Sequence, residues 1–201
     1  FFDINKQKND YFCILFLHIS QHAITLIFMS KKIILLGYMG CGKSTIGAHI
    51  ATSLSLPFQD LDVFIAEQEG KSIPEIFQEK GEIYFRRQEQ EHLKRLLALP
   101  YPMVVALGGG TPCYGKAMEL VREATPYSFY LQLPAKELVA RLSLQQEQRP
   151  LITGIVKENL EEFVNIHLFE RAAFYTQAAF VIPCLGLSVE EIGEKIRQKI
   201  K

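Results

Sequence analysis

Hydrophobic residues divide most of this chain into short apolar runs that alternate with amphipathic stretches. Continuous apolar runs are typical of strands buried on both faces of a parallel sheet. In the stretch after the first run, Ile46, Ile50, Ala51 and Leu54 fall on one helical face. Alternating strands and helices predict a single α/β domain with helices on both faces of a parallel sheet. The five expected strands are 32–36, 57–62, 103–107, 127–133 and 179–182.

Local signals set the expected helix boundaries. Ser72 and Glu75 have the spacing of a capping box, and Gly81 is placed to end that helix before a longer one begins. The polar stretch 145–154 has no clear period and predicts a loop. One expected helix directly follows the phosphate-binding motif described next. The other expected helices are 63–68, 72–80, 82–99, 116–123, 135–144, 156–176 and 188–200.

The segment 37–45 has the pattern of a phosphate-binding loop, with Gly37, Gly42, Lys43 and Ser44 in the required positions. Glycines let successive backbone N–H groups turn toward a polyphosphate, and the following helix adds its positive end. A glycine-rich turn that binds nothing is the alternative. The strand before the segment and the helix after it favour a phosphate-binding loop, which we call the cradle (residues 37–45). Its expected ATP-binding residues are Gly40, Cys41, Gly42, Lys43, Ser44 and Thr45, with Lys43 reaching the β- and γ-phosphates and Ser44 ligating Mg²⁺.

Two acids, Asp60 and Asp62, end the second expected strand. Residues two apart on a strand point to the same side, so both carboxylates could face the cradle. Asp60 could then serve the Mg²⁺ shell, while Asp62 accepts a proton from a substrate hydroxyl. The third strand ends in Ala106 and Leu107 without an acid, which makes Asp60 the best available metal partner. A solvated strand end or a helix cap remains the simpler alternative.

Arginines supply the other candidate chemistry. Arg86, followed by Arg87, lies early on a predicted long helix, and Arg171 lies near the end of another. A guanidinium fork suits a carboxylate ligand, although surface ion pairs are a common alternative on helices. Arg149, in the polar loop, could reach a transferring phosphate when that loop closes, or could simply be solvent-exposed.

Three consecutive glycines, 108–110, follow the third expected strand. They predict either an ordinary tight turn or a place where a polar ring approaches the backbone closely. Ligands in open α/β sheets gather at the carboxyl ends of strands. The cradle, the acid pair and this glycine turn are therefore expected on one edge of the sheet.

Composition narrows the class of partner. The 22 basic residues balance the 22 acidic residues, so no nucleic-acid partner is indicated. The four cysteines are widely spaced and form no CxxC pair, which favours a reducing cytoplasm over a disulfide frame or zinc site. The five histidines show no ligand spacing.

The first 28 residues fit this pattern poorly. Residues 11–28 are apolar but interrupted by polar side chains, which disfavours a membrane anchor, and no small-residue cleavage site marks a signal peptide. We expect Met29 to be the natural start, 1–28 to be a poorly ordered upstream extension, and 29–201 to be one domain.

Taken together, these residues resemble the shikimate kinases, which are nucleoside-monophosphate-kinase-like P-loop enzymes. The resemblance covers about residues 30–199, and the loop motif alone is shared by very many NTPases. Its combination with the later motifs is far more specific. The motifs are the phosphate loop 37–45, Asp60-x-Asp62, Phe85-Arg-Arg-Gln-Glu89, Gly108-Gly-Gly110, Arg149-Pro-Leu151, and Arg171 with Tyr175.

The resemblance implies a P-loop kinase fold with strand order 2-3-1-4-5 and transfer of phosphate from ATP, with Mg²⁺, to the 3-hydroxyl of shikimate. Asp62 would help deprotonate that hydroxyl, and Arg86 and Arg171 would grip the substrate carboxylate. Glu89 would orient Arg86. The substrate ring would lie against Gly108, Gly109 and Gly110, and Lys43 and Arg149 would contact the phosphates. Mg²⁺ would be held by Ser44 directly and by Asp60 through water. The resemblance also implies a substrate-binding segment at 63–97 and a lid at 145–154.

Some features depart from the family pattern. The lid is short and rich in glutamine, so Arg141 is the nearest candidate for a second lid arginine. The loop 183–187 lacks polar residues that could contact adenine. A kinase for another small anionic polyol, such as gluconate, and a non-catalytic ATP-sensing module remain alternatives. We expect a cytoplasmic monomer with no membrane partner.

Overall fold

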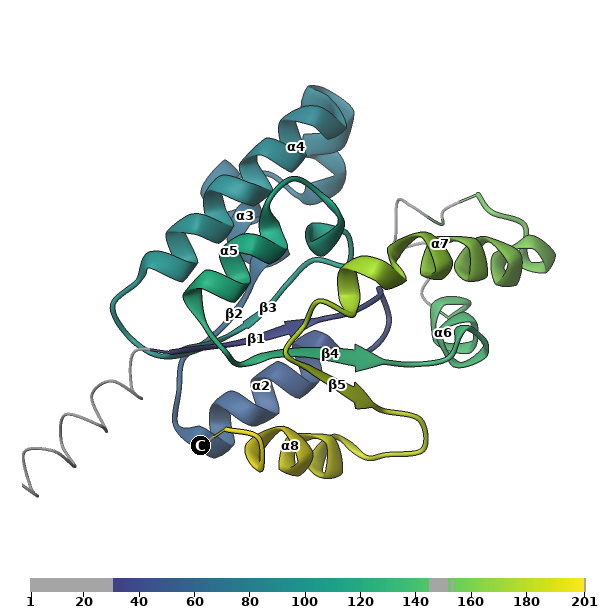
Figure 1. Ribbon diagram of the computed structural model, residues 1–201. Helices are drawn as coiled ribbons and strands as arrows, with labels where there is room; N and C mark the ends of the chain where they lie inside the picture. The colour runs from purple at the N-terminus through teal and green to yellow at the C-terminus, as the bar shows by residue number, and fades with distance from the viewer. Residues whose placement is uncertain (1–30, 145–151, 153, 201) are drawn as a thin grey trace, which may run out of the picture.

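The computed structural model describes residues 31–144, 152 and 154–200. Its centre is one five-stranded parallel sheet with the order β2-β3-β1-β4-β5, as the resemblance implied (Figure 1). The central position of β1 places the loop that follows it in the middle of one sheet edge. The strands are β1 (Lys32–Leu36), β2 (Phe58–Asp60), β3 (Met103–Ala106), β4 (Ser128–Gln132) and β5 (Phe180–Pro183).

Helices cover both faces of this sheet, which confirms the predicted layers. In Figure 1, α2 and α8 lie on one face and α3, α4 and α5 on the other, while α6 and α7 lie beyond the carboxyl ends of the strands. The helices are α2 (Lys43–Leu54), α3 (Leu61–Glu69), α4 (Ile73–Ala98), α5 (Ala117–Ala124), α6 (Ala135–Leu142), α7 (Leu160–Tyr175) and α8 (Val189–Arg197), with 3₁₀ turns η1 (Thr111–Cys113) and η3 (Lys157–Asn159).

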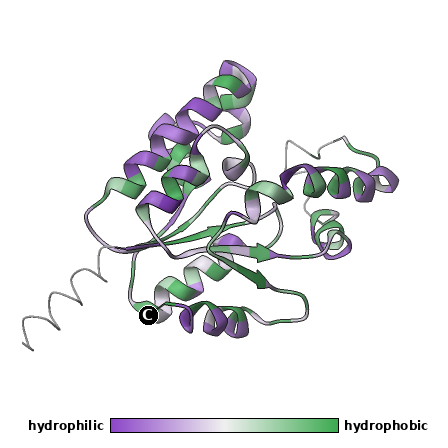
Figure 2. Cartoon of the chain, in the orientation of Figure 1, coloured by the Kyte–Doolittle hydropathy of each residue, from purple (hydrophilic) through white to green (hydrophobic). Residues whose placement is uncertain are grey.

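The core consists of the sheet and the helix faces turned toward it. Every residue of β1 and β3 is buried, as expected for strands covered on both sides, and the strands are apolar in Figure 2. Lys32 is the polar exception, with 1% of its surface exposed. Its ammonium group donates to the carbonyl oxygens of Leu99 and Tyr101, at 2.6 Å each, at the amino end of the sheet.

The prediction that Asp62 extends a strand is wrong. β2 ends at Asp60, and α3 begins at Leu61, so Asp62 lies in the first helical turn. Asp60 is the N-cap of α3, because its side chain accepts a hydrogen bond from the Asp62 N–H at 3.0 Å. The cap alternative was therefore correct for Asp60, and the two carboxylates do not share a strand face.

Most other boundaries agree with the sequence. The capping box of Ser72 and Glu75 is present, and Gly81 interrupts α4 with φ 78° and ψ 170°. Helix α7 begins at Leu160, after the predicted start at 156, because the short turn η3 precedes it. The turn η1, directly after the three glycines, was not predicted.

Two sets of predictions concern residues that lie outside the ranges that the structure describes. Residues 1–30 include the expected extension, and residues 145–151 and 153 include Arg149 and most of the predicted lid. Within the described ranges, no helix combines the length and hydrophobicity needed to span a bilayer.

Candidate active site

The phosphate-binding loop forms a tight curve between β1 and α2. Gly37, Gly40 and Gly42 all have positive φ, at 144°, 80° and 95°, which L side chains rarely adopt. At Gly37 a Cβ atom would also lie 2.7 Å from the Leu131 carbonyl oxygen. The loop closes onto α2 through the bond from the Ile46 N–H to the Gly42 carbonyl at 2.9 Å. The sequence therefore builds the cradle at the amino end of a helix, where backbone N–H groups favour anions.

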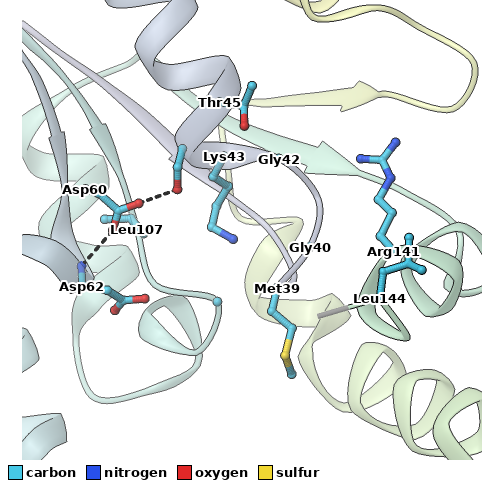
Figure 3. Close-up of a pocket in the computed structure, with 12 residues that line it drawn as sticks. Met39, Gly40, Gly42, Lys43, Thr45, Asp60, Asp62, Leu107, Arg141 and Leu144 are labelled. Carbon is cyan, nitrogen blue, oxygen red and sulfur yellow. Dashed lines mark hydrogen bonds between the residues drawn. The ribbon is translucent and has the colours of Figure 1, made fainter. Parts of the chain in front are cut away.

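Lys43 spans this cradle. Its ammonium group donates to the carbonyl oxygens of Gly37 at 2.9 Å and Tyr38 at 3.0 Å. Only 9% of the residue is exposed, and in Figure 3 the amine projects into the space between Asp62 and Met39. The charge is thus held over the position where a polyphosphate would bend around the loop.

Ser44 and Asp60 bring two oxygen groups together beside the cradle. The Ser44 hydroxyl donates to Asp60 Oδ2 at 2.5 Å, and the other Asp60 oxygen caps α3 (Figure 3). A hydroxyl and a carboxylate suit Mg²⁺, which keeps several waters and takes few protein ligands. Among the described residues no group of three or more His, Cys, Asp or Glu side chains could hold a metal ion alone.

Asp62 faces a cavity of about 490 Å³ that it shares with the cradle (Figure 3). Burial raises the pKa of its carboxyl to about 6, and the nearby Glu89 and Asp60 charges add to this, while Lys43 and Arg86 oppose it. A carboxylate with this pKa is suited to accept a proton near neutral pH. The cavity is lined by Met39, Gly40, Gly42, Lys43, Ser44, Thr45, Asp60, Asp62, Leu107, Gly109, Arg141 and Leu144.

The three glycines after β3 are needed because functional groups approach their backbone closely. A Cβ on Gly108 would lie 2.6 Å from Asp62 Oδ1, and one on Gly109 would lie 3.1 Å from the Met39 nitrogen. A Cβ on Gly110 would lie 3.0 and 3.1 Å from the two Nη atoms of Arg86. None of the three has a positive φ, so lack of space selects glycine here. The turn therefore lies between the acid, the cradle and an arginine.

Arg86 is fixed by a set of contacts around its guanidinium. Nε donates to Glu82 Oε1 at 3.2 Å, and Nη1 donates to Glu89 Oε2 at 3.0 Å. The ring of Tyr114 lies 4.0 Å from Cζ, and its hydroxyl donates to the same Glu82 oxygen at 3.1 Å. These contacts leave one Nη1 and two Nη2 hydrogens for a ligand. No sequence signal marked Tyr114, because the turn η1 that precedes it was not predicted.

Arg171 comes from α7, on the other side of the glycine turn. Its Cζ lies 5.7 Å from the ring centre of Tyr38 in the cradle. Tyr175, one turn later, donates to the Gly109 carbonyl at 2.7 Å and so ties α7 to the turn. Burial raises the pKa of the Cys113 thiol to about 11, and Arg171 and Arg86 both oppose this rise.

The structure brings together the predicted cradle, acid pair, glycine turn and both arginines. Arg87 is turned elsewhere, with its Cζ 5.4 Å from the Tyr84 ring. Arg141, the nearest candidate for a second lid arginine, lines the cavity opposite Asp62 (Figure 3). Thr111 was missed entirely. It is a buried residue whose hydroxyl donates to Glu89 Oε1 at 2.6 Å.

A parallel sheet with this cradle, an oxygen pair suited to Mg²⁺ and a carboxylate poised for proton transfer defines a P-loop kinase. Comparison with known proteins makes the class specific. The family model for shikimate kinase matches residues 39–201. The chain belongs to the shikimate kinase family.

Individual relatives agree over nearly their whole length. The shikimate kinase of Flavobacterium johnsoniae is 39% identical over 83% of this chain and 96% of its own. The crystal structure of shikimate kinase from Bacteroides thetaiotaomicron has a TM-score of 0.75 at 34% identity, covering 84% of this chain and 95% of that one. The structure of the Acinetobacter baumannii enzyme in complex with shikimate has a TM-score of 0.77 at 32% identity, covering 85% and 92%. A gluconokinase from Sinorhizobium meliloti, at 17% identity and a TM-score of 0.55, shares the fold alone.

Proposed function

We propose that this protein transfers the terminal phosphoryl group of ATP to the 3-hydroxyl of shikimate. The products are ADP and shikimate 3-phosphate, a step of chorismate and aromatic amino acid biosynthesis. The observation that carries the proposal is one cavity holding both Lys43 and Asp62, with Arg86 beside the glycine turn that borders it and Arg171 near Tyr38 of the phosphate-binding loop. This arrangement provides groups for both substrates within one site.

On the nucleotide side, the loop from Gly40 to Thr45 would hold the phosphates through its backbone N–H groups. Lys43 would leave its two carbonyl partners for phosphate oxygens, which are stronger acceptors because they are charged. The family uses ATP, generally with Mg²⁺. We assign the ion to Ser44 directly and to Asp60 through water, where it would neutralise charge on the transferred phosphoryl group.

On the acceptor side, Asp62 would take the proton from the attacking hydroxyl, which it is suited to do because of its raised pKa. The free hydrogens of Arg86, together with Arg171, would hold the substrate carboxylate. Gly108, Gly109 and Gly110 would allow the ring to lie against their backbone. The segment 63–97, which contributes Arg86 and Glu89, would then be the substrate-binding segment.

Three assignments rest on the sequence pattern alone. Arg149 lies outside the described residues, and its role at the transferring phosphate, within a lid at 145–154, remains a prediction from the Arg149-Pro-Leu151 motif. A monomeric state and a cytoplasmic location also remain predictions.

The test is a coupled assay for ADP release with ATP, Mg²⁺ and shikimate, with gluconate in parallel and with no acceptor as the blank. We expect ADP release that depends on shikimate, and shikimate 3-phosphate identified by mass spectrometry. Release no faster than the blank would refute the assignment, and faster release with gluconate would redirect it.

Asp62→Asn tests the chemical role in the same assay. The variant should bind ATP as the native protein does and lose at least about a hundredfold in kcat, the usual contribution of general acid–base catalysis. Turnover close to that of the native protein would remove Asp62 from the role of base.

A further inference from the structure

Glu89 is a buried carboxylate whose two oxygens have different partners. Only 1% of the residue is exposed. Oε2 accepts from Arg86 Nη1 at 3.0 Å, and Oε1 accepts from the Thr111 hydroxyl at 2.6 Å. A charge buried this deeply is costly unless each oxygen is paired, so both contacts are needed to keep Glu89 in place.

The direction of the Thr111 bond is fixed by chemistry. A hydroxyl has one proton to donate, and an ionised carboxylate can only accept. Thr111 is itself 1% exposed, and its N–H donates to the Gly108 carbonyl at 3.2 Å, so the hydroxyl is carried by a turn that is closed on itself. The Thr111 hydroxyl therefore reaches Glu89 from the glycine turn, whereas Arg86 reaches it from within helix α4, which carries both residues.

Glu89 and Asp62 both approach the turn on the same side of Gly108. The position of a Cβ on Gly108 is 2.6 Å from Asp62 Oδ1, 2.9 Å from Thr111 Oγ1 and 3.0 Å from Glu89 Oε1. Two carboxylates so close repel each other. The single Thr111 proton is committed to Glu89, which holds that carboxylate against Arg86 and leaves Asp62 facing the cavity.

We infer that Thr111 is a positioning residue for the anionic part of the substrate. Its hydroxyl fixes Glu89, and Glu89 holds the Arg86 guanidinium so that the remaining hydrogens of Arg86 point toward a bound carboxylate. This inference rests on the proposed function. Without the hydroxyl, Glu89 would retain one buried, unpaired oxygen beside Asp62, and Arg86 would lose its fixed orientation.

The test replaces the hydroxyl and keeps the shape. Thr111→Val should raise the KM for shikimate about tenfold, the size of effect expected when one hydrogen bond to a charged group is lost, and should leave the KM for ATP within about twofold. Thr111→Ser retains the donor and should restore the KM for shikimate to within about threefold of the native value. In a Glu89→Gln background, Thr111→Val should cause little further loss, because both changes break the same chain of contacts.

Thr125→Val is the matched control. Thr125 is also buried, and its hydroxyl also donates at 2.6 Å, but to the Lys32 carbonyl at the far end of the sheet. This variant should lower the melting temperature without changing either KM.

Several outcomes would overturn the inference. They are an unchanged KM for shikimate in Thr111→Val, equal impairment in Thr111→Ser, or an equal rise in Thr125→Val. If Thr111→Val does not fold, Thr111→Ala and calorimetric binding of shikimate replace it, and native affinity in Thr111→Ala would also overturn the inference. Native protein that does not phosphorylate shikimate would refute the proposed function itself, whereas active native protein with an unaffected Thr111→Val refutes only the role of Thr111.

Discussion

At the scale of single residues, the Asp62 carboxylate lies in surroundings that disfavour its charge. Burial, Glu89 and Asp60 all raise its pKa, and the two cations nearby offset only part of this rise. Such a group is useful as a base and costly to the fold, which is a common conflict at active sites. Asp62 should therefore limit both the pH range of activity and the stability of the protein.

The pH dependence of activity follows from this pKa. We expect kcat/KM for shikimate to fall as the pH drops through about 6, approaching a tenfold loss per pH unit below that value, because the protonated acid cannot accept a proton. Steady-state kinetics between pH 5 and 8 measure this limb. An acid limb near pH 4, the value of an unperturbed carboxyl group, would contradict the prediction.

Ionisation of Asp62 supports activity but lowers the stability of the fold. Because the folded-state pKa of Asp62 is above its unfolded value of 3.8, ionisation destabilises the fold at neutral pH, and this cost disappears as the pH falls below both values. Asp62→Asn should therefore raise the free energy of unfolding by about 1–3 kcal/mol at pH 7.5 and by much less at pH 4. Thermal unfolding at the two pH values tests this, and a variant less stable than the native protein at pH 7.5 would refute it.

At the scale of elements, the contact between α2 and β2 sets the position of Asp60 relative to Ser44. Gly47 faces β2 directly, and a Cβ there would lie 2.4 Å from the Phe58 ring. Phe58 precedes Asp60 on the same short strand. Any side chain at position 47 would therefore push this strand away from α2 and separate the two oxygens proposed to serve Mg²⁺.

We expect Gly47→Ala to lower the free energy of unfolding by about 1–3 kcal/mol and to raise the apparent Mg²⁺ requirement of the reaction. Gly193→Ala is a matched control in α8, where the new Cβ would meet the His49 side chain at 2.8 Å, and that side chain can rotate away. The control should be neutral or slightly stabilising, because alanine favours helix. Equal effects of both substitutions on chemical denaturation and Mg²⁺ titration would contradict this account.

At the scale of the whole molecule, stability and chemistry lie at opposite ends of one sheet. The cradle, Asp62 and the glycine turn follow the carboxyl ends of the strands, whereas the buried Lys32 ammonium ties two carbonyls together at the amino end. Parallel strands all point the same way, so loops at one end can vary while the other end holds the fold. A substitution of Lys32 should therefore lower the stability of the fold and leave substrate binding unchanged.

Lys32→Met should lower the free energy of unfolding by about 2–4 kcal/mol, because the Leu99 and Tyr101 carbonyls would each lose a partly buried hydrogen bond to a charged group. Both KM values should stay within about twofold of the native values at temperatures where the variant is folded. Calorimetry and the coupled assay measure the two quantities, and a changed KM for shikimate would show that the two ends are coupled.

The sequence by itself determined the elements and most of the site. Strand runs, the phosphate-loop pattern and caps such as Ser72 depend on neighbours within a few residues, so they are readable along the chain. The motifs also named the arginines and the acid pair, although the local signal misjudged where β2 gives way to α3 and so placed Asp62 on a strand.

Only the tertiary structure decided how these residues meet. Thr111 and Glu89 are 22 positions apart, and nothing local marks the contact between them. The need for glycine at 108 and 110 likewise arises from side chains of other elements, Asp62 and Arg86, that pack against the turn. Contacts between distant segments depend on packing in three dimensions, whereas periodicity and capping depend on the local backbone, and this difference explains which features a single sequence could predict.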